Sequence, residues 1–229
     1  MVQKSAFEAL RRRLESAAGG RHVTLVAASK SQPADAIRGL AAEGQRVFGE
    51  NYVQEALAKQ RELSGLRLEW HMIGPLQSNK CPEVAQHFDW LQSLDREKLI
   101  APLDRARPAN MPPLKVLIEV NISGESSKSG CAPDQVAALA AKIVQAPRLR
   151  LRGLMAIPQP SPEREQRRAA FVGLRRMFED LRAAHPEADT LSMGMSEDFE
   201  LAIAEGATMV RVGTALFGER KSKVESGKS

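Results

Sequence analysis

The chain has 229 residues, of which 43% are hydrophobic and 27% charged, and this composition excludes an extensively disordered protein. The formal net charge is +5, but the basic residues are scattered over segments expected to be helical, so we expect no nucleic acid partner. The two cysteines, Cys81 and Cys131, match neither a disulfide framework nor a zinc site and are typical of a cytoplasmic protein. No apolar run is long enough to cross a membrane.

The N-terminal residues 1–18 alternate charged side chains with Phe7, Leu10 and Leu14, which predicts an amphipathic helix and not a secretion signal. After this segment, short apolar runs alternate with stretches of helical spacing. Several runs are almost continuously hydrophobic, as buried parallel strands are. The eight predicted strands are residues 23–29, 46–48, 68–73, 90–94, 114–120, 149–157, 190–193 and 209–212.

Four of the intervening segments have a clear helical pattern, namely residues 33–43, 133–145, 162–184 and 197–205. Eight strands that alternate with helices predict an α/β fold, a single (β/α)8 barrel over residues 1–218, followed by a polar tail over 219–229. An open doubly wound sheet is the alternative. That fold usually carries a GxGxxG turn after its first strand, and none is present here.

The active face of such a barrel lies at the C-terminal ends of its strands. Lys30 follows the first predicted strand, Asn51 follows the second, and Arg211, Gly213 and Thr214 lie at the end of the eighth. These residues are therefore expected to meet at one mouth. Lys30 alone has a simpler interpretation as a lysine that points to water, but a desolvated lysine beside other cations can attack an aldehyde as an amine.

The seventh and eighth strands end in residues suited to binding a phosphate group. Ser192 and Met193 precede a glycine, and Gly213 and Thr214 follow Arg211. Barrels often bind phosphate at these two loops, although serine and glycine are also ordinary turn residues. Together with Lys30 on the first strand, the pattern indicates a phosphorylated aldehyde as ligand.

Two other polar residues have less specific interpretations. His71 lies at an expected strand end and is predicted to be a packed or hydrogen-bonding wall residue. Lys128 lies in a glycine- and serine-rich loop, where a solvated side chain is the favoured interpretation and secondary contact with an aldehyde is the alternative.

Over about residues 23–218 the chain resembles the pyridoxal phosphate homeostasis protein family. The resemblance is carried by VAASK at 26–30, FGENYVQE at 48–55, WHMIGPLQSNK at 70–80, VN at 120–121 with KSG at 128–130, GLMAI at 153–157, LSMGMSED at 191–198 and VRVGTALFG at 210–218. The departures are small, since Ala28 stands where valine is usual and Met72 where phenylalanine is usual.

The resemblance implies a barrel like the N-terminal domain of alanine racemase, with pyridoxal 5′-phosphate (PLP) as cofactor. It implies that Lys30 binds PLP as a Schiff base, with Asn51 near that end of the ring and Arg211 facing the pyridine nitrogen. Ser192, Gly213 and Thr214 are implied around the phosphate, and we include Met193 among the cofactor-binding residues.

The same resemblance implies a role in intracellular PLP homeostasis. An arginine beside the pyridine nitrogen can only donate hydrogen bonds, which disfavours protonation of the ring and weakens it as an electron sink. The chain has a single tyrosine, Tyr52, and we expect no second domain to supply a second base. We therefore expect a non-catalytic carrier that binds PLP and other B6 vitamers and contacts apo PLP enzymes transiently. We expect a monomer, because no large unpaired apolar stripe stands out in the sequence.

Two enzymes are the alternatives. One is a PLP-dependent amino-acid racemase or decarboxylase of low activity. The other is a barrel enzyme that acts on a phosphorylated sugar through Lys30.

Overall fold

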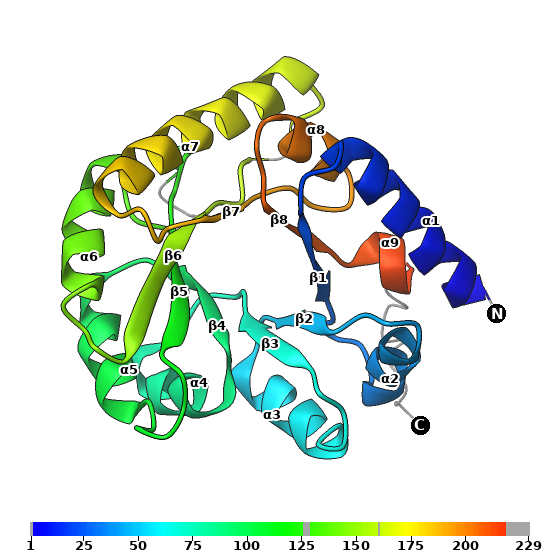
Figure 1. Cartoon of the computed structure of the whole chain (residues 1–229), viewed down its shortest axis with the longest axis horizontal. Helices are drawn as coiled ribbons and strands as arrows, with labels where there is room; N and C mark the ends of the chain where they lie inside the picture. The colour runs from blue at the N-terminus through cyan, green and yellow to red at the C-terminus, as the bar shows by residue number, and fades with distance from the viewer. Residues whose placement is uncertain (1, 126–128, 160, 219–229) are drawn as a thin grey trace, which may run out of the picture.

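The computed structural model describes residues 2–125, 129–159 and 161–218. Eight parallel strands form a closed barrel in which neighbours in sequence pair with each other and the last strand pairs with the first (Figure 1). The strands are β1 (Thr24–Ala28), β2 (Val47–Glu50), β3 (Glu69–Met72), β4 (Trp90–Leu94), β5 (Leu114–Glu119), β6 (Leu149–Met155), β7 (Thr190–Ser192) and β8 (Met209–Val212).

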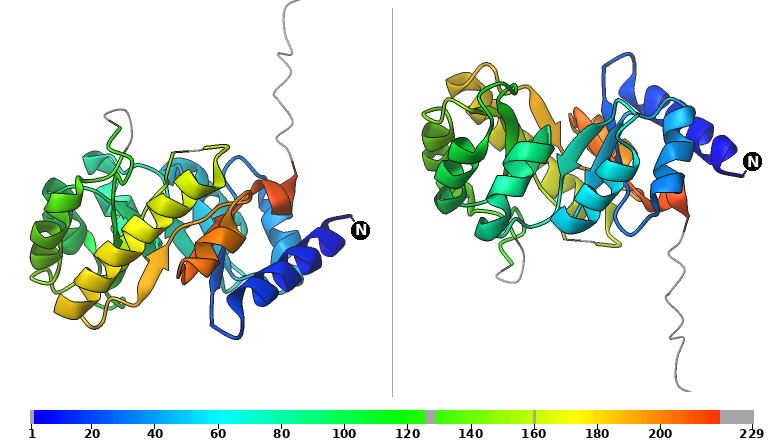
Figure 2. Two further views of the ribbon diagram at one scale, coloured as in Figure 1. Left: turned by 90° about the horizontal axis from the view of Figure 1, so that it is seen from above. Right: turned by 90° about the horizontal axis from the view of Figure 1, so that it is seen from below.

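Helices surround the strands on the outside of the barrel, as the three views in Figures 1 and 2 show. They are α1 (Val2–Ala18), α2 (Ala34–Ala42), α3 (Val53–Glu62), α4 (Cys81–His87), α5 (Ile100–Ala106), α6 (Val136–Ile143), α7 (Arg164–Ala184), α8 (Phe199–Ala204) and α9 (Thr214–Phe217). Three short 3₁₀ helices, η1 (Ser78–Lys80), η2 (Glu97–Leu99) and η3 (Pro133–Gln135), precede α4, α5 and α6. The additional helix α1 packs against α8 and α9 beside β1.

The predicted fold class is confirmed, and each predicted strand is found to within about two residues at each end. The predicted helices are also found, with α2 starting at Ala34 because Pro33 adopts an extended backbone (ψ 158°) and stands just before the helix. The chain leaves α2 through Gly44, whose φ of 104° suits a glycine after a helix end. The short helices α3, α4, α5 and α9 were not predicted from the sequence. The predicted tail, residues 219–229, lies outside the described residues.

The apolar core has two parts. The larger part lies between the strands and the surrounding helices, and it includes the inward face of α7 with Phe171, Leu174 and Phe178. The smaller part contains Val26, Trp90, Leu117, Met155 and Met209 from five different strands, and it lies inside the barrel. Among the described helices, none combines the length and the apolar character that crossing a bilayer requires.

Polar side chains share the inside of the barrel with this smaller cluster. His71 on β3, Gln92 on β4, Glu119 on β5, Ser192 on β7 and Arg211 on β8 are all at most 5% exposed. Alternation along each strand brings these side chains to the same face of the sheet as the interior apolar residues. The barrel therefore carries polar groups from its interior up to the C-terminal ends of its strands.

Candidate functional site

A cavity of about 560 Å³ opens at the C-terminal ends of the strands, a size that suits a small molecule. Its walls come from the ends of β1, β2, β3 and β8 and from the loops after β6 and β7. The lining residues are Ala28, Lys30, Asn51, Ile73, Ile157, Pro158, Gln159, Ser161, Pro162, Arg167, Met195, Ser196, Glu197, Asp198, Arg211, Gly213 and Thr214.

Five of the seven residues predicted from the sequence line this one cavity: Lys30, Asn51, Arg211, Gly213 and Thr214. The first and the last of these residues, Lys30 and Thr214, are separated by 184 positions in the sequence. They come together because the barrel closes between β1 and β8. The convergence expected at the strand ends is thus present in the structure. Lys128 lies outside the described residues.

Ser192 and Met193 do not line the cavity. Both side chains are fully buried at the end of β7. The hydroxyl of Ser192 donates a hydrogen bond to Gln92 Oε1 at 2.7 Å and accepts one from Arg211 Nη1 at 2.6 Å. Its hydroxyl is therefore engaged within the barrel interior, and the structure does not bring it to the cavity as a phosphate donor.

Arg211 is held by two fixed acceptors although it is only 4% exposed. Its Nη1 donates to Ser192, and its Nη2 donates to the carbonyl oxygen of Ala156 at 2.9 Å. Burial lowers the pKa of Arg211 to about 10, and the neighbouring Glu119 opposes this shift. The guanidinium thus remains protonated at neutral pH and meets the cavity as a hydrogen-bond donor.

A chain of hydrogen bonds continues from Arg211 through the inside of the barrel. Beyond Ser192, the amide nitrogen of Gln92 lies 2.8 Å from His71 Nδ1, and His71 Nε2 lies 2.8 Å from Glu69 Oε1. We call these five side chains, Arg211, Ser192, Gln92, His71 and Glu69, the interior relay. It crosses the barrel through β8, β7, β4 and β3.

Every hydrogen bond of the interior relay has the same direction, with the donor on the side of Arg211 and the acceptor on the side of Glu69. Burial lowers the pKa of His71, so the ring is neutral and has one N–H and one acceptor nitrogen. Because the amide of Gln92 donates to Nδ1, the remaining proton is assigned to Nε2, which donates to Glu69. The hydrogen bond from His71 lowers the pKa of Glu69 to about 2, which keeps that carboxylate ionised as the final acceptor. This confirms His71 as a hydrogen-bonding wall residue, which also stacks on Trp90.

Two glycines permit the close approach of segments at the cavity. A Cβ at Gly213 would lie 3.1 Å from the carbonyl oxygen of Ala28, so a glycine allows the end of β8 to pack against β1 just before Lys30. A Cβ at Gly74 would lie 2.5 Å from the carbonyl oxygen of Asn51. The loop after β3 can therefore support the backbone of Asn51 only if residue 74 has no side chain.

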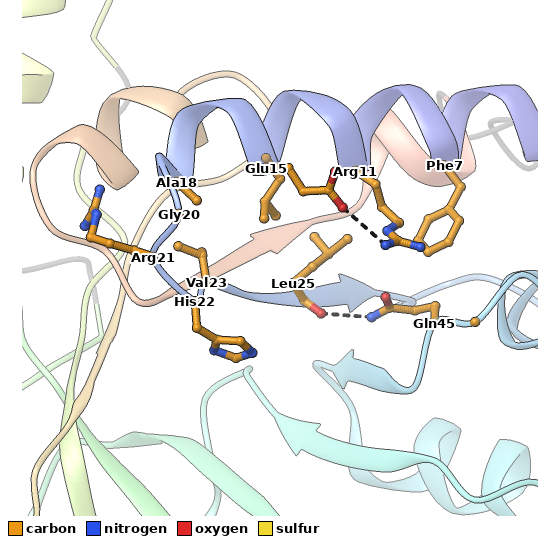
Figure 3. A pocket seen from close by; sticks show the side chains of 12 residues that line it. Phe7, Arg11, Glu15, Ala18, Gly20, Arg21, His22, Val23, Leu25 and Gln45 are labelled. Carbon is orange, nitrogen blue, oxygen red and sulfur yellow. Dashed lines mark hydrogen bonds and ion pairs between the residues drawn. The ribbon is translucent and has the colours of Figure 1, made fainter.

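A second cavity, of about 470 Å³, lies between α1 and β1, away from the strand ends (Figure 3). Several of its polar groups are engaged with each other or with the backbone: Arg11 pairs with Glu15 at 3.2 Å, and the amide of Gln45 donates to the carbonyl oxygen of Leu25 at 2.8 Å. Figure 3 shows Phe7 on α1 and Val23, which immediately precedes β1, among the residues that line it. It contains none of the residues predicted from the sequence as a site.

Sequence reasoning missed several residues of the site. The loop after β6 contributes Ile157, Gln159 and Ser161, and α7 contributes Arg167, but nothing in their local pattern distinguishes them from an ordinary surface loop and helix. Gln92 was missed because a glutamine inside a five-residue strand gives no periodic signal. Among the described residues, no group of three or more histidine, cysteine, aspartate or glutamate side chains could hold a metal ion.

The fold and this site define a class: a (β/α)8 barrel in which a lysine after the first strand and a buried arginine on the last strand face one small-molecule cavity. A family model described as the alanine racemase N-terminal domain matches residues 2–221. The chain belongs to the pyridoxal phosphate homeostasis protein family, as its curated relatives demonstrate.

The relative from Pseudomonas aeruginosa, a pyridoxal phosphate homeostasis protein, is 56% identical over 223 residues, which cover 96% of both chains. A relative of the same name from Escherichia coli K12 is 52% identical over 86% of both chains. Among solved structures, PipY of Synechococcus elongatus with PLP bound has a TM-score of 0.84 and 40% identity, and the alignment covers 94% of this chain and 100% of PipY.

Proposed function

We propose that this protein binds PLP in the cavity at the strand ends and takes part in PLP homeostasis as a carrier or buffer, without turning over a substrate. The observation that carries the proposal is that Lys30, Arg211 and Gly213 line a single cavity of small-molecule size. The names of the relatives and the PLP bound to PipY support it. A cytoplasmic location belongs to the proposal and is supported by two free, buried cysteines, Cys81 and Cys131.

The residues of the cavity fit PLP by the chemistry of their donors. Lys30 supplies a primary amine, and the aldehyde of PLP condenses with such an amine, so that a C=N bond forms and one water leaves. The site combines this amine with the buried guanidinium of Arg211 and with the small residues Gly213 and Thr214 at the end of β8. We assign the pyridine end of the ligand to Arg211 and the phosphate end to Gly213 and Thr214, with Asn51 beside Lys30.

Ser192 has a different role in this proposal from the one expected at first. Its hydroxyl bridges Gln92 and Arg211, so we assign it to holding the guanidinium and not to contacting the phosphate. Met193 follows Ser192 and is fully buried, so we assign it to the packing beneath the cavity.

The proposal of a carrier is supported by Arg211. A charged guanidinium beside a pyridine nitrogen disfavours protonation of that nitrogen, which is the state that stabilises negative charge on a bound amino acid. We expect PLP and other phosphorylated B6 vitamers as ligands, transient contact with apo PLP enzymes as partners, and a monomer in solution.

Hydrogen exchange tests this proposal against a PLP-dependent enzyme. The PLP-loaded protein is incubated with L-amino acids in D2O, and the α-hydrogen is followed by NMR, with a Lys30→Ala variant as control. The proposal predicts no exchange beyond one equivalent per protein, together with activation of an apo PLP enzyme when the loaded protein is added. Catalytic exchange that depends on Lys30 would contradict it.

A further inference from the structure

The backbone immediately after Lys30 adopts an unusual conformation. Ser31 has a φ of 63°, and it is the only residue other than glycine with a positive φ in the described part of the chain. A Cβ makes this left-handed region unfavourable, so a serine there needs support from its surroundings. The N–H of Ser31 donates a hydrogen bond to Glu55 Oε1 of α3 at 2.6 Å. A side chain from a neighbouring helix therefore supports the turn that follows Lys30.

The backbone immediately before Lys30 is held from the same side. Ser29 is fully buried, and its hydroxyl donates to Glu50 Oε1 of β2 at 2.6 Å. Its N–H donates to the carbonyl oxygen of Gly49 at 2.9 Å. Its own carbonyl oxygen accepts a hydrogen bond from Lys59 Nζ at 2.8 Å. Both peptide groups of Ser29 are thus fixed to β2 and α3.

Lys59 joins the two halves of this arrangement. Its ammonium group contacts three oxygens: Ser29 O, Glu50 Oε1 at 2.7 Å and Glu55 Oε1 at 2.6 Å. Three acceptors satisfy the three N–H donors of an ammonium group, which explains how Lys59 can be only 6% exposed. Burial raises the pKa of Glu50, and the hydrogen bonds from Lys59 and Ser29 oppose that shift.

A role in general stability explains this network poorly. Buried ion pairs add little to stability compared with apolar residues of the same volume, because desolvation of the charges offsets their attraction. An ordinary Glu55–Lys59 pair, spaced by four residues on one helix, would lie on the surface. Here Glu50 and Lys59 are buried and both hydrogen-bond to Ser29. Glu55, which Lys59 contacts, accepts the hydrogen bond from Ser31 on the other side of Lys30. None of Glu50, Glu55 and Lys59 lines the cavity itself.

We propose that Glu50, Glu55 and Lys59 form a clamp that fixes the turn Ser29–Ser31 and thereby sets the position of the Lys30 amine before the cofactor arrives. They are positioning residues, which act on the cofactor only through Lys30. The proposal rests on the proposed function, because it assumes that Lys30 is the residue that binds PLP covalently. A preset amine lowers the entropic cost of forming the covalent bond.

Affinities for two ligands distinguish a network that positions Lys30 from one that only maintains the structure of the site. PLP and pyridoxine 5′-phosphate share the ring and the phosphate, but the second has an alcohol in place of the aldehyde and cannot condense with an amine. The affinities of both are measured for the wild type, Glu55→Gln, Lys59→Met and the control Glu62→Gln. Glu62 lies on the exposed side of the same helix.

The clamp predicts that Glu55→Gln and Lys59→Met lower the affinity for PLP by about ten-fold while the affinity for pyridoxine 5′-phosphate changes by less than about two-fold. Glu62→Gln is expected to change neither affinity. In the Glu55→Gln background, Ser31→Gly is expected to restore most of the affinity for PLP, because glycine adopts a positive φ without support.

Three outcomes would overturn the clamp. Equal losses for the two ligands would mean that the network only maintains the fold, and unchanged affinity for PLP would mean that it does not act on Lys30. If Ser31→Gly did not restore the affinity for PLP in the Glu55→Gln background, Glu55 would not act through the conformation of Ser31. Failure of the proposed function is recognised separately, because wild-type protein that does not bind PLP would overturn both proposals. Wild-type protein that binds PLP without a borohydride-reducible product on Lys30 would overturn the assignment of Lys30 and the clamp.

Discussion

At the scale of single residues, Glu119 has the most unusual environment near the site. It ends β5 and is 5% exposed, and its Oε2 has no hydrogen-bond partner among the residues that the structure describes. Burial, together with the nearby Asp95, raises the pKa of Glu119 to about 7, although Arg211 opposes the shift. The carboxyl group therefore holds its proton in the folded protein at pH values where an unfolded chain has released it.

This environment predicts how stability depends on pH. Between about pH 4.5 and 7 the folded state binds more protons at Glu119 than the unfolded state does, so its contribution to the free energy of unfolding falls as the pH rises. Glu119→Gln removes that dependence. Urea unfolding should find the variant close to the wild type at pH 5 and more stable by on the order of 1–3 kcal/mol at pH 8.

The exposed Glu62→Gln serves as the control, since its stability relative to the wild type should be the same at both pH values. Comparing the Glu119→Gln and Glu62→Gln variants separates the effect of Glu119 from that of His71, which both variants retain. The lowered pKa of His71 makes stability rise with pH, the opposite of the effect of Glu119. A Glu119→Gln variant that loses stability equally at pH 5 and pH 8 would contradict this account.

At the scale of structural elements, the interior relay connects strands that are far apart in the sequence. Ser192 and Gln92 are separated by 100 positions, and each is buried with its partner supplied by the other strand. A sequence shows that these residues are polar and lie in short strands. It does not show that the side chains meet, because β4 and β7 are not neighbours in the sheet and closure of the barrel brings their inward side chains together.

Gln92→Leu tests the relay, because leucine fills a similar volume and makes no hydrogen bonds. The hydroxyl of Ser192 would then lose its acceptor, although Arg211 still donates to it, and the Nδ1 atom of His71 would lose its donor. We expect the free energy of unfolding in urea to fall by roughly 2–4 kcal/mol.

Gln60→Leu is the matched control, since Gln60 donates to the carbonyl oxygen of His87 on the surface of α3. Its effect should stay below about 1 kcal/mol. Equal effects of the two substitutions would show that the relay contributes nothing beyond an ordinary surface hydrogen bond.

Helices show a similar division between what the sequence predicts and what it does not. The 21-residue α7 was predicted because Phe171, Leu174, Phe178 and Leu181 form one clear stripe. Helices α4 and α5 have seven residues each and show no comparable stripe. The six-residue α8 was predicted within residues 197–205, which Gly206 follows as a helix-end signal. The apolar strand runs were predictable for the opposite reason, since burial on both faces requires an almost continuous hydrophobic stretch.

At the scale of the whole molecule, the alternation of strands and helices was sufficient to predict the barrel, and the barrel then determined which strand ends share a cavity. That is why the sequence alone could group Lys30, Asn51, Arg211, Gly213 and Thr214, which line one cavity. The exceptions were Ser192 and Met193. Their place at the end of β7 was predicted, but the sequence does not show that both side chains are buried beneath the cavity.

Binding of PLP should stabilise the whole barrel, because the ligand joins groups from β1, β2 and β8 that only the folded chain brings together. At about 100 times its dissociation constant, a ligand adds roughly 2.7 kcal/mol. For a chain of this size that corresponds to a rise in Tm of roughly 5–10 °C, measured by circular dichroism. Inorganic phosphate at the same concentration should have little effect, and an equal rise with phosphate alone would contradict specific binding.

Covalent labelling tests the central claim most directly. The protein is loaded with PLP, reduced with borohydride, digested and mapped by mass spectrometry, with Lys30→Ala treated in parallel. We predict one reduced pyridoxyl group per chain, located on Lys30, and no labelled peptide in the variant. A label on another lysine such as Lys128, or a variant labelled as fully as the wild type, would contradict the assignment of Lys30 as the cofactor-binding residue.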